Sequence, residues 1–274
     1  MSQFCGHATA TVSPRPSVSF DTLTHLHLAT DTVTWKRWVR QEETQGVTGR
    51  VVASTHPQAW TSTQKVASDA NSDCLLGIHP WWANQVDPST RNQHYEWLKT
   101  QTLLSGIGEI GLDYVRAKTT QQRSVQKAVL EEQLALAHSL SLPVLLHCVR
   151  AHSDLLHILK GFSQTPIHGV FHGWTGGPQY IDTALNLGFS VSFGPSLLQP
   201  QRQKIHESAK RVPMDRLCIE TDWPDGVRAW EPAPGQGALK TVAAHLARLR
   251  DAPIESVWAA CGANAANIWG RSIS

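Results

Sequence analysis

The stretch Gly106-Ile-Gly-Glu-Ile-Gly-Leu-Asp-Tyr114 places a carboxylate, Glu109, in an apolar and glycine-rich run. Its first half has the pattern of a short strand, Gly106 to Ile110, that ends in a tight glycine turn. The stretch contains no Lys or Arg, and a carboxylate at a strand end needs a cation, for which a metal ion is a good candidate. An acid after a strand is more often a helix cap or a turn residue, so the rest of the chain must decide.

Seven further β-rich runs alternate with helical patterns on both sides of this stretch. They are Val18 to Leu28, Gly49 to Ser54, Cys74 to Ile78, Leu142 to His147, Ile167 to His172, Phe189 to Phe193 and Arg216 to Thr221. The connections are long enough to cross over, so we expect parallel strands. Eight such strands in 274 residues predict an α/β protein with a single-domain (β/α)8 TIM barrel. The alternative is a doubly wound open sheet, but no G-x-G-x-x-G follows the first strand.

The composition is that of a globular protein, with 41% hydrophobic and 17% charged residues. The net charge of +2 gives no strong electrostatic case for nucleic acid. Five cysteines are scattered singly without a C-x-x-C, which indicates a reducing compartment rather than disulfides or a thiolate metal site. No apolar run reaches the roughly 18 residues of a membrane span, and the N-terminus lacks a signal-peptide pattern. We therefore expect a cytoplasmic protein.

The first 17 residues are rich in Ser, Thr and Pro and have no periodicity. This pattern predicts a flexible N-terminal arm at residues 1–17, followed by one (β/α)8 domain at residues 18–274. No composition shift marks a second domain.

Polar residues stand at the ends of most of the expected strands, where the catalytic groups of a barrel gather. They are His25, His27, His79, Glu109, His147, His172 and Asp222. His25 and His27 are two apart on the expected first strand, so both rings would face the barrel interior and could chelate one ion. Histidine and carboxylate ligands suit Zn, Mn, Fe or Mg. A single histidine is usually a hydrogen-bonded core or surface group, but six such residues on five strands favour a metal site, with His79 ranked below the others as a ligand.

These residues carry a resemblance to the TatD family of metal-dependent hydrolases, within the amidohydrolase superfamily. The matching segments are His25-Leu-His-Leu28, Gly77-Ile-His-Pro80, Gly108-Glu-Ile-Gly-Leu-Asp-Tyr114, Leu142-Pro-Val-Leu-Leu-His147, His172-Gly-Trp-Thr-Gly176, Glu220-Thr-Asp-Trp-Pro224 and Asn264-Ala-Ala-Asn267. They occur in the family's order from about residue 24 to the C-terminus, and jointly they are highly specific.

The resemblance implies two divalent metal ions in the barrel, Zn, Mg or Mn. His25, His27 and Asp222 would hold one ion, His147 and His172 would hold the other, and Glu109 would bridge them. It also implies a deoxyribonuclease, since family members are typically described as DNases, some with 3′ to 5′ exonuclease activity. DNA, as single strands or ends, is then the expected partner.

Several positions depart from the family pattern. Leu23 stands where the family often has Asp, and Arg150 lies three residues after His147 rather than two. Trp174 replaces a usual Phe, and the N-terminal arm is extra. None of these differences removes an expected ligand, so they bear on the substrate and on the surroundings of the ligands.

The expected mechanism is attack on a phosphodiester by a water that two metal ions activate. Asp222 and Glu109 are the expected catalytic residues, with Asp222 accepting the proton of the water. His79, Arg150 and Trp174 are the expected substrate contacts, because Arg matches phosphate and Trp can stack on an unpaired base. For Arg150, a salt bridge at the start of the next helix is an equal alternative. For Trp174 and the other tryptophans at this end of the barrel, a place in the wall of the pocket is slightly favoured over contact with a base.

Two other functions remain open. The same ligands serve amidohydrolase-superfamily enzymes that cleave non-nucleic-acid esters, amides or lactones. A non-catalytic partner subunit is a third possibility, which the intact ligand set argues against. The native metal, DNA versus RNA preference, cleavage polarity, oligomeric state and role of residues 1–17 do not follow from the sequence.

Overall fold

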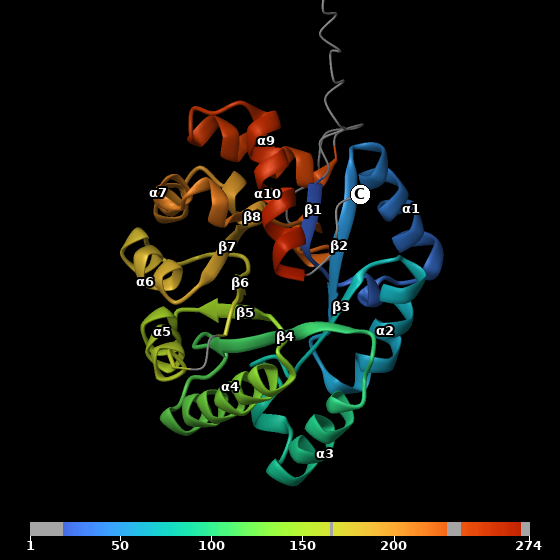
Figure 1. Ribbon diagram of the computed structural model, residues 1–274, viewed down its shortest axis with the longest axis vertical. Helices are drawn as coiled ribbons and strands as arrows, with labels where there is room; N and C mark the ends of the chain where they lie inside the picture. The colour runs from blue at the N-terminus through green and yellow to red at the C-terminus, as the bar shows by residue number, and fades with distance from the viewer. Residues whose placement is uncertain (1–18, 165–166, 229–236, 270–274) are drawn as a thin grey trace, which may run out of the picture.

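Eight parallel strands form one sheet in chain order, which curls into a nearly closed barrel (Figure 1). The computed structural model describes residues 19–164, 167–228 and 237–269. The strands are β1 (Ser19–Thr24), β2 (Val47–Ala53), β3 (Asp73–Leu76), β4 (Leu104–Asp113), β5 (Val144–Val149), β6 (Gly169–Phe171), β7 (Phe189–Phe193) and β8 (Leu217–Ile219). The predicted single-domain (β/α)8 barrel is confirmed.

The barrel closes where the end of β1 meets the chain that follows β8. Thr24 forms a parallel bridge with Trp223, and the His25 amide donates to the Trp223 carbonyl oxygen at 2.7 Å. The Asp222 amide donates in turn to the Leu23 carbonyl oxygen at 3.0 Å. This seam fixes His25 and Asp222 side by side.

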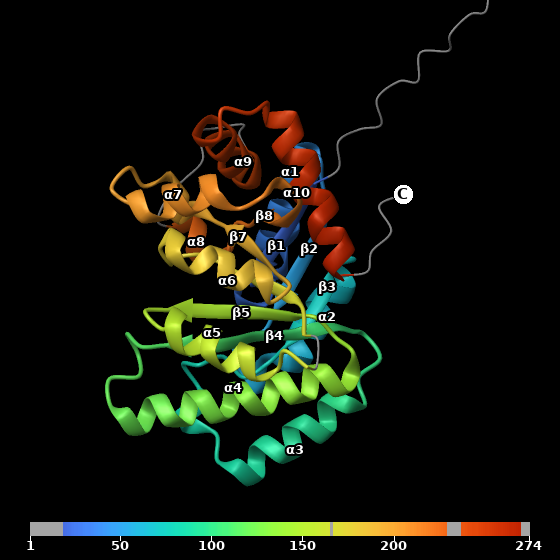
Figure 2. The same cartoon turned by 60° about the vertical axis from the view of Figure 1, so that its left-hand side comes forward.

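Helices cover the outside of the barrel (Figures 1 and 2). They are α1 (Thr32–Thr44), α2 (Trp60–Asp69), α3 (Pro88–Lys99), α4 (Thr120–Leu140), α5 (His152–Gly161), α6 (Ile181–Asn186), α7 (Gln203–Arg211), α8 (Asp225–Arg228), α9 (Ala238–Leu249) and α10 (Ile254–Trp269). The longest, α4, has the bounds that its periodicity predicts. It begins at a capping box between Thr119 and Gln122 and ends at Ser141, whose backbone is left-handed.

The end of the barrel at which the strands begin is filled by α10. Ala265 and Trp269 pack in an apolar cluster with Phe20, Leu23 and interior residues of the neighbouring strands. A Cβ on Gly106, near the start of β4, would lie 2.9 Å from the Trp269 ring. The opposite end, where the strands end, is therefore the end that can open to a substrate.

The predicted lengths of β4 and β1 differ most from those in the structure. β4 continues to Asp113, so the prediction of a glycine turn after Ile110 is wrong. Gly111 extends the strand with a φ of +146°, and a Cβ there would lie 1.9 Å from the His147 carbonyl oxygen, which only glycine avoids. β1 ends at Thr24 rather than Leu28, because Leu26–Leu28 form a 3-10 turn.

Some expectations are only partly covered by the described residues. The arm at residues 1–17, Cys5 and Trp230 lie outside them. The cysteines that the structure describes, Cys74, Cys148, Cys218 and Cys261, are free and buried. In the described part of the chain, no helix combines the length and the apolar character needed to cross a membrane.

Candidate metal centre

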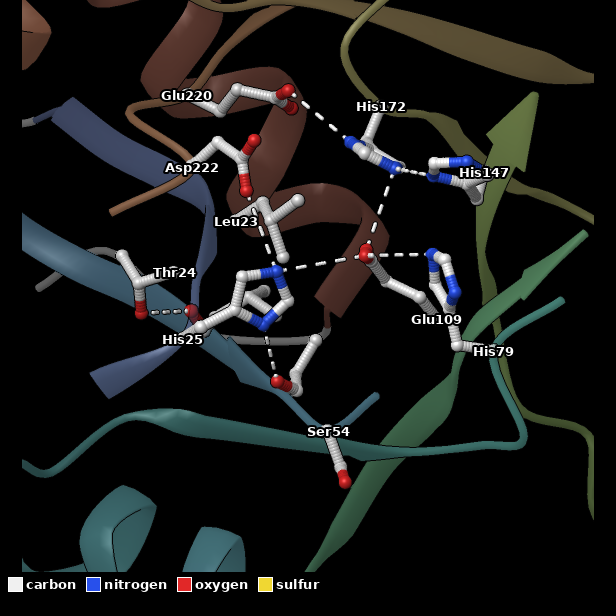
Figure 3. Close-up of polar contacts among 12 residues, drawn as sticks. Leu23, Thr24, His25, Ser54, His79, Glu109, His147, His172, Glu220 and Asp222 are labelled. Carbon is white, nitrogen blue, oxygen red and sulfur yellow. Dashed lines mark hydrogen bonds and ion pairs between the residues drawn. The ribbon is translucent and has the colours of Figure 1, made fainter. Parts of the chain in front are cut away.

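A layer of histidine and carboxylate side chains lies across the open end of the barrel (Figure 3). Its members come from the ends of β1, β3, β5, β6 and β8 and from the middle of β4: His25, His79, Glu109, His147, His172, Glu220 and Asp222. An apolar layer lies below them, in which Leu23, Leu145, Val170 and Cys218 each stand two residues before a polar member. The parallel strands thus bring residues that are far apart in sequence into one polar layer.

Glu109 stands at the centre of this layer and is 2% exposed. Its carboxylate oxygens lie 3.6 Å from His25 Nε2, 3.9 Å from His79 Nε2 and 3.4 Å from His172 Nε2. The oxygen that faces His172, Oε2, is buried without a hydrogen-bond partner. A buried carboxylate that is surrounded by histidine nitrogens and is only partly bonded has the surroundings of a metal ligand.

Three histidines gather on one side of Glu109. His147 Nδ1 lies 3.1 Å from His172 Nε2, and one ligand atom each of His79, Glu109 and His147 lies within 4.8 Å of the others. This separation is suited to a single ion at the centre of the group, since metal–nitrogen distances are about 2.0–2.1 Å for Zn. We call His79, Glu109, His147 and His172 the three-histidine side.

The other side of Glu109 has fewer donors. His25 Nε2 lies 3.4 Å from Asp222 Oδ1 and 3.6 Å from Glu109 Oε1. The second ring nitrogen of His25, Nδ1, contacts the Ala53 carbonyl oxygen at 2.8 Å, which turns Nε2 toward the two carboxylates. We call His25, Glu109 and Asp222 the one-histidine side.

The charges of the layer are strongly coupled. Burial lowers the pKa of His25 and of His172, but neighbouring carboxylates, Glu109 foremost, outweigh it and raise these values to about 9 and about 10. Burial and the positive charges of His147 and His172 hold the pKa of His79 well below its usual range. For Asp222, burial would raise the pKa, yet its bond with His25 and the nearby histidine charges bring it below the ordinary value. Metal binding must therefore displace protons from histidine.

Further carboxylates orient the histidines. Asp113 Oδ2 lies 3.4 Å from His147 Nε2 and accepts a hydrogen bond from Trp81 Nε1 at 2.7 Å. Glu220 Oε1 lies 3.4 Å from His172 Nδ1. Sequence reasoning assigned no role to either residue, although both lie in the quoted segments. The signal was their position: Asp113 closes the glycine-rich strand, and Glu220 stands two residues before Asp222.

The donor set fits a divalent ion. The layer offers neutral or displaceable imidazole nitrogens and an incompletely bonded buried carboxylate. Three of its histidines, His25, His147 and His172, are held from behind by a carbonyl or a carboxylate. This is the arrangement by which proteins orient metal-binding histidines.

Comparison with known proteins agrees with this chemistry. The family described as TatD related DNase matches residues 20–270. The chain belongs to the TatD family of metal-dependent hydrolases. A relative named 3′-5′ ssDNA/RNA exonuclease TatD, from Rahnella sp. (strain Y9602), is 32% identical over 68% of this chain and 71% of its own length. An uncharacterized metal-dependent hydrolase, YabD from Bacillus subtilis, is 30% identical over 66% of this chain and 71% of its own length.

A solved structure of a TatD homologue has the same fold. The crystal structure of YjjV from Escherichia coli superposes with a TM-score of 0.82 at 25% identity, covering 93% of this chain and 98% of that one.

The TatD-like centre brings together most of the predicted ligands. His25, Glu109, His147, His172 and Asp222 share the polar layer, and His79 lies in the same layer, where its expected role as a substrate contact stays a prediction. The reason given for pairing His25 with His27 is wrong, because β1 ends at Thr24 and strand alternation does not reach residue 27.

His27 lies on the 3-10 turn, with its ring centroid 5.9 Å from that of His25. Both of its ring nitrogens are buried without hydrogen-bond partners, and no described contact joins it to Glu109 or Asp222. Burial, with the charge of His25, lowers its pKa to about 3. Its role as a ligand stays a prediction.

The two other predicted substrate contacts lie outside the polar layer. Trp174 is 1% exposed and makes edge-on ring contacts with His152 and Phe171, so it forms part of the wall beside the polar layer. Arg150 is exposed, has a left-handed φ of 53°, and lines a neighbouring hollow. Arg150 does not form the alternative salt bridge, at the start of the next helix, with any described residue.

Proposed function

We propose that this chain is a nuclease that hydrolyses phosphodiester bonds, acting on single-stranded DNA from its 3′ end with two divalent ions. The observation that carries the proposal is Glu109, a buried carboxylate within 4 Å of three histidines, with one oxygen lacking a hydrogen bond. The name of the Rahnella relative, a 3′-5′ ssDNA/RNA exonuclease, supports the class of substrate.

The two sides of Glu109 are the proposed metal positions. His147 and His172 with Glu109 would hold one ion, with His79 available as a further donor. His25 and Asp222 with Glu109 would hold the other, together with His27, whose buried ring nitrogens have no hydrogen-bond partner. Bound divalent ions supply an activated water and neutralise the charge that develops on a phosphate under attack.

Asp222 is placed to accept a proton. Its side chain is 36% exposed and that of Glu109 is 3% exposed, so Asp222 is the more accessible of the two carboxylates. Its lowered pKa keeps the carboxylate ionised at neutral pH, and Oδ1 faces His25, which leaves Oδ2 for a proton from water. Glu109 then serves to hold the layer together rather than to exchange protons with solvent.

A hollow of about 500 Å³ gives a substrate access to this layer. It is lined by His147, His172, Glu220 and Asp222, with Gly173, Gly194 and Gly226 among the other residues. Half-exposed Trp81 stands at the same end of the barrel, where it donates to Asp113 and carries Arg116 4.6 Å above its ring. A half-exposed aromatic ring beside a metal centre is suited to contact with an unpaired base.

Hydrolysis of labelled strands by metal-stripped protein tests the proposal. With Mg, Mn or Zn restored, a 5′-labelled single strand should give a ladder of shortened products, and a 3′-labelled strand should release labelled mononucleotide at once. Duplex DNA and single-stranded RNA complete the panel. Asp222→Asn should be inactive, whereas Asp69→Asn, which changes an exposed residue of α2, should be as active as the wild type.

Failure to cleave DNA or RNA with any ion, in protein shown to bind metal, would refute the nuclease. The hydrolase barrel would remain, and the substrate would then be sought among small esters, amides and lactones. A cytoplasmic location also stays a prediction, supported by the four described cysteines that are free and buried.

A further inference from the structure

A second hollow, of about 450 Å³, opens beside the metal centre. We call it the basic cavity and define it by Arg150, Thr175, Gly176, Gly177, Arg202 and Lys204. Thr175 also lines the hollow above His147, His172 and Asp222, so the two spaces are adjacent. A ligand that lies on the metal centre can therefore extend directly into the basic cavity.

Two of the strands that supply the three-histidine side, β5 and β6, also lead into this cavity. Arg150 follows His147 by three residues at the end of β5, and Thr175 follows His172 by three residues after β6. Arg202 and Lys204 stand at the start of α7. The position of the cavity relative to the metal centre is thus set by the barrel itself.

The charge of the cavity is positive. In the described part of the chain, no ion pair joins Arg150, Arg202 or Lys204 to a carboxylate. The one acidic residue of the lining, Asp154, is already compensated by Lys127 at 2.7 Å and by the Tyr114 hydroxyl at 2.5 Å. Three cations are thus available to an anionic ligand.

Backbone groups add to this charge. The helices α5 and α7 both begin at the cavity, and neither has a side-chain cap at its N-terminus, so their first amides are available to an anion. Gly176 and Gly177 are buried, and they allow the chain to approach a ligand closely.

The wall behind the glycines is rigid. The His152 ring stacks on Tyr180 at an interplanar angle of 17°, and a Cβ on Gly176 would lie 2.6 Å from that ring. His152 is 7% exposed, lines the cavity, and has an Nε2 without a hydrogen-bond partner. A pre-formed wall reduces the ordering that a ligand would have to impose.

We propose that the basic cavity binds the phosphates that neighbour the scissile phosphate on a single nucleic-acid strand. The inference rests on the proposed nuclease function. Arg150, Arg202 and Lys204 contact the backbone rather than the bases, so they give affinity without sequence preference. The Arg202 Nε atom bonds Gln199 at 3.0 Å, which fixes the guanidinium and leaves its two Nη groups for a phosphate.

Binding of a fluorescein-labelled thymidine oligonucleotide in EDTA tests this inference without cleavage. For the Arg202→Ala/Lys204→Ala double variant, the slope of log Kd against log salt should fall by about 1.4, because each phosphate contact on a single strand contributes about 0.7. A matched control, Arg37→Ala/Arg40→Ala, removes the same charge from the exposed surface of α1 and should keep the wild-type slope.

A kinetic comparison separates this inference from the proposed function. With metal restored, the double variant should raise KM for the oligonucleotide and leave hydrolysis of bis(p-nitrophenyl) phosphate, which has one phosphate, unchanged. A salt slope and KM equal to those of the control would overturn the basic cavity while leaving the nuclease standing. A loss of bis(p-nitrophenyl) phosphate hydrolysis in the double variant would also overturn it, because the effect would then lie at the metal centre.

Discussion

At the scale of single residues, the polar layer is asymmetric about Glu109. The three-histidine side brings together the nitrogens of His79, His147 and His172, whereas on the one-histidine side the contacts given by the structure join only His25 to Glu109 and Asp222. Leu23, two residues before His25, packs in the apolar cluster of the barrel and has no donor atom. The two metal positions should therefore differ in affinity.

His172→Ala and His25→Ala form a matched pair that tests this difference. We expect His172→Ala to weaken the tighter of two metal-binding events. The loss of a supporting residue costs roughly 10–100-fold in metal affinity, and the loss of a ligand should cost more. His25→Ala should weaken only the looser event. Calorimetric titration of metal-free protein with Mn or Zn measures both, and loss of the tighter event in His25→Ala would contradict the assignment.

The sequence predicts the members of the layer better than their supports. Glu109, His147, His172 and Asp222 could be found because each stands at or near the end of an expected strand, and the ends of parallel strands meet. Asp113 and Glu220 were missed despite their positions near expected ligands, since each acts through a histidine that is 34 or 48 positions away along the chain. His27 was grouped with His25 by spacing and by the family resemblance, and the spacing argument does not apply because β1 ends at Thr24.

At the scale of elements, the metal centre depends on how β1 is tied to the chain after β8. Asp21 is fully buried and accepts hydrogen bonds from the Thr221 amide at 2.9 Å and the Thr221 hydroxyl at 2.6 Å. These bonds fix the residue next to Asp222. Asp21 is thus a positioning residue that does not itself touch the layer.

Asp21→Ala should loosen this tie. We expect metal affinity to fall roughly 10–100-fold, as for other residues that support ligands, and unfolding free energy to fall by about 1–3 kcal/mol, since the buried Thr221 amide is left unbonded. Metal titration and urea unfolding measure the two effects. Asp182→Ala, which changes an exposed residue of α6, is the control. Unchanged metal affinity in a destabilised Asp21→Ala protein would show that the tie serves stability alone.

The lengths of β1 and β4 show that the end of a strand can depend on contacts that the local sequence does not reveal. Apolar alternation marks where a strand begins, but the end of β4 depends on Gly111, whose φ and close approach to His147 exist only in the folded barrel. The bounds of α4 were predictable because its capping box and its periodicity are both local.

At the scale of the whole molecule, the barrel could be predicted because strands and helices alternate eight times with crossover-length connections. The part that α10 plays could not, because its contact with the barrel interior through Ala265 and Trp269 joins the two ends of the chain. Because α10 covers the end at which the strands begin, the substrate can enter at the opposite end, where the polar layer lies.

Metal binding should stabilise the folded barrel. The layer holds a buried carboxylate and several histidines that gain partners only when an ion is bound, so free metal at about 100 times its Kd should add about 2.7 kcal/mol. For a chain of this size that corresponds to a rise in Tm of roughly 5 °C or more. Thermal unfolding with and without EDTA measures the shift. A Tm that is the same with and without metal would contradict a metal site in the folded layer.

The central claim is that Glu109 joins both metal positions of a hydrolytic centre, and Glu109→Gln tests it most directly. The variant keeps the size of the side chain and removes its charge. We predict that bound metal, measured by mass spectrometry after dialysis, falls together with cleavage of single-stranded DNA, the latter by at least about 100-fold. Glu96→Gln, on the exposed surface of α3, should match the wild type in both. Glu109→Gln protein that keeps its metal and its cleavage rate would contradict the claim.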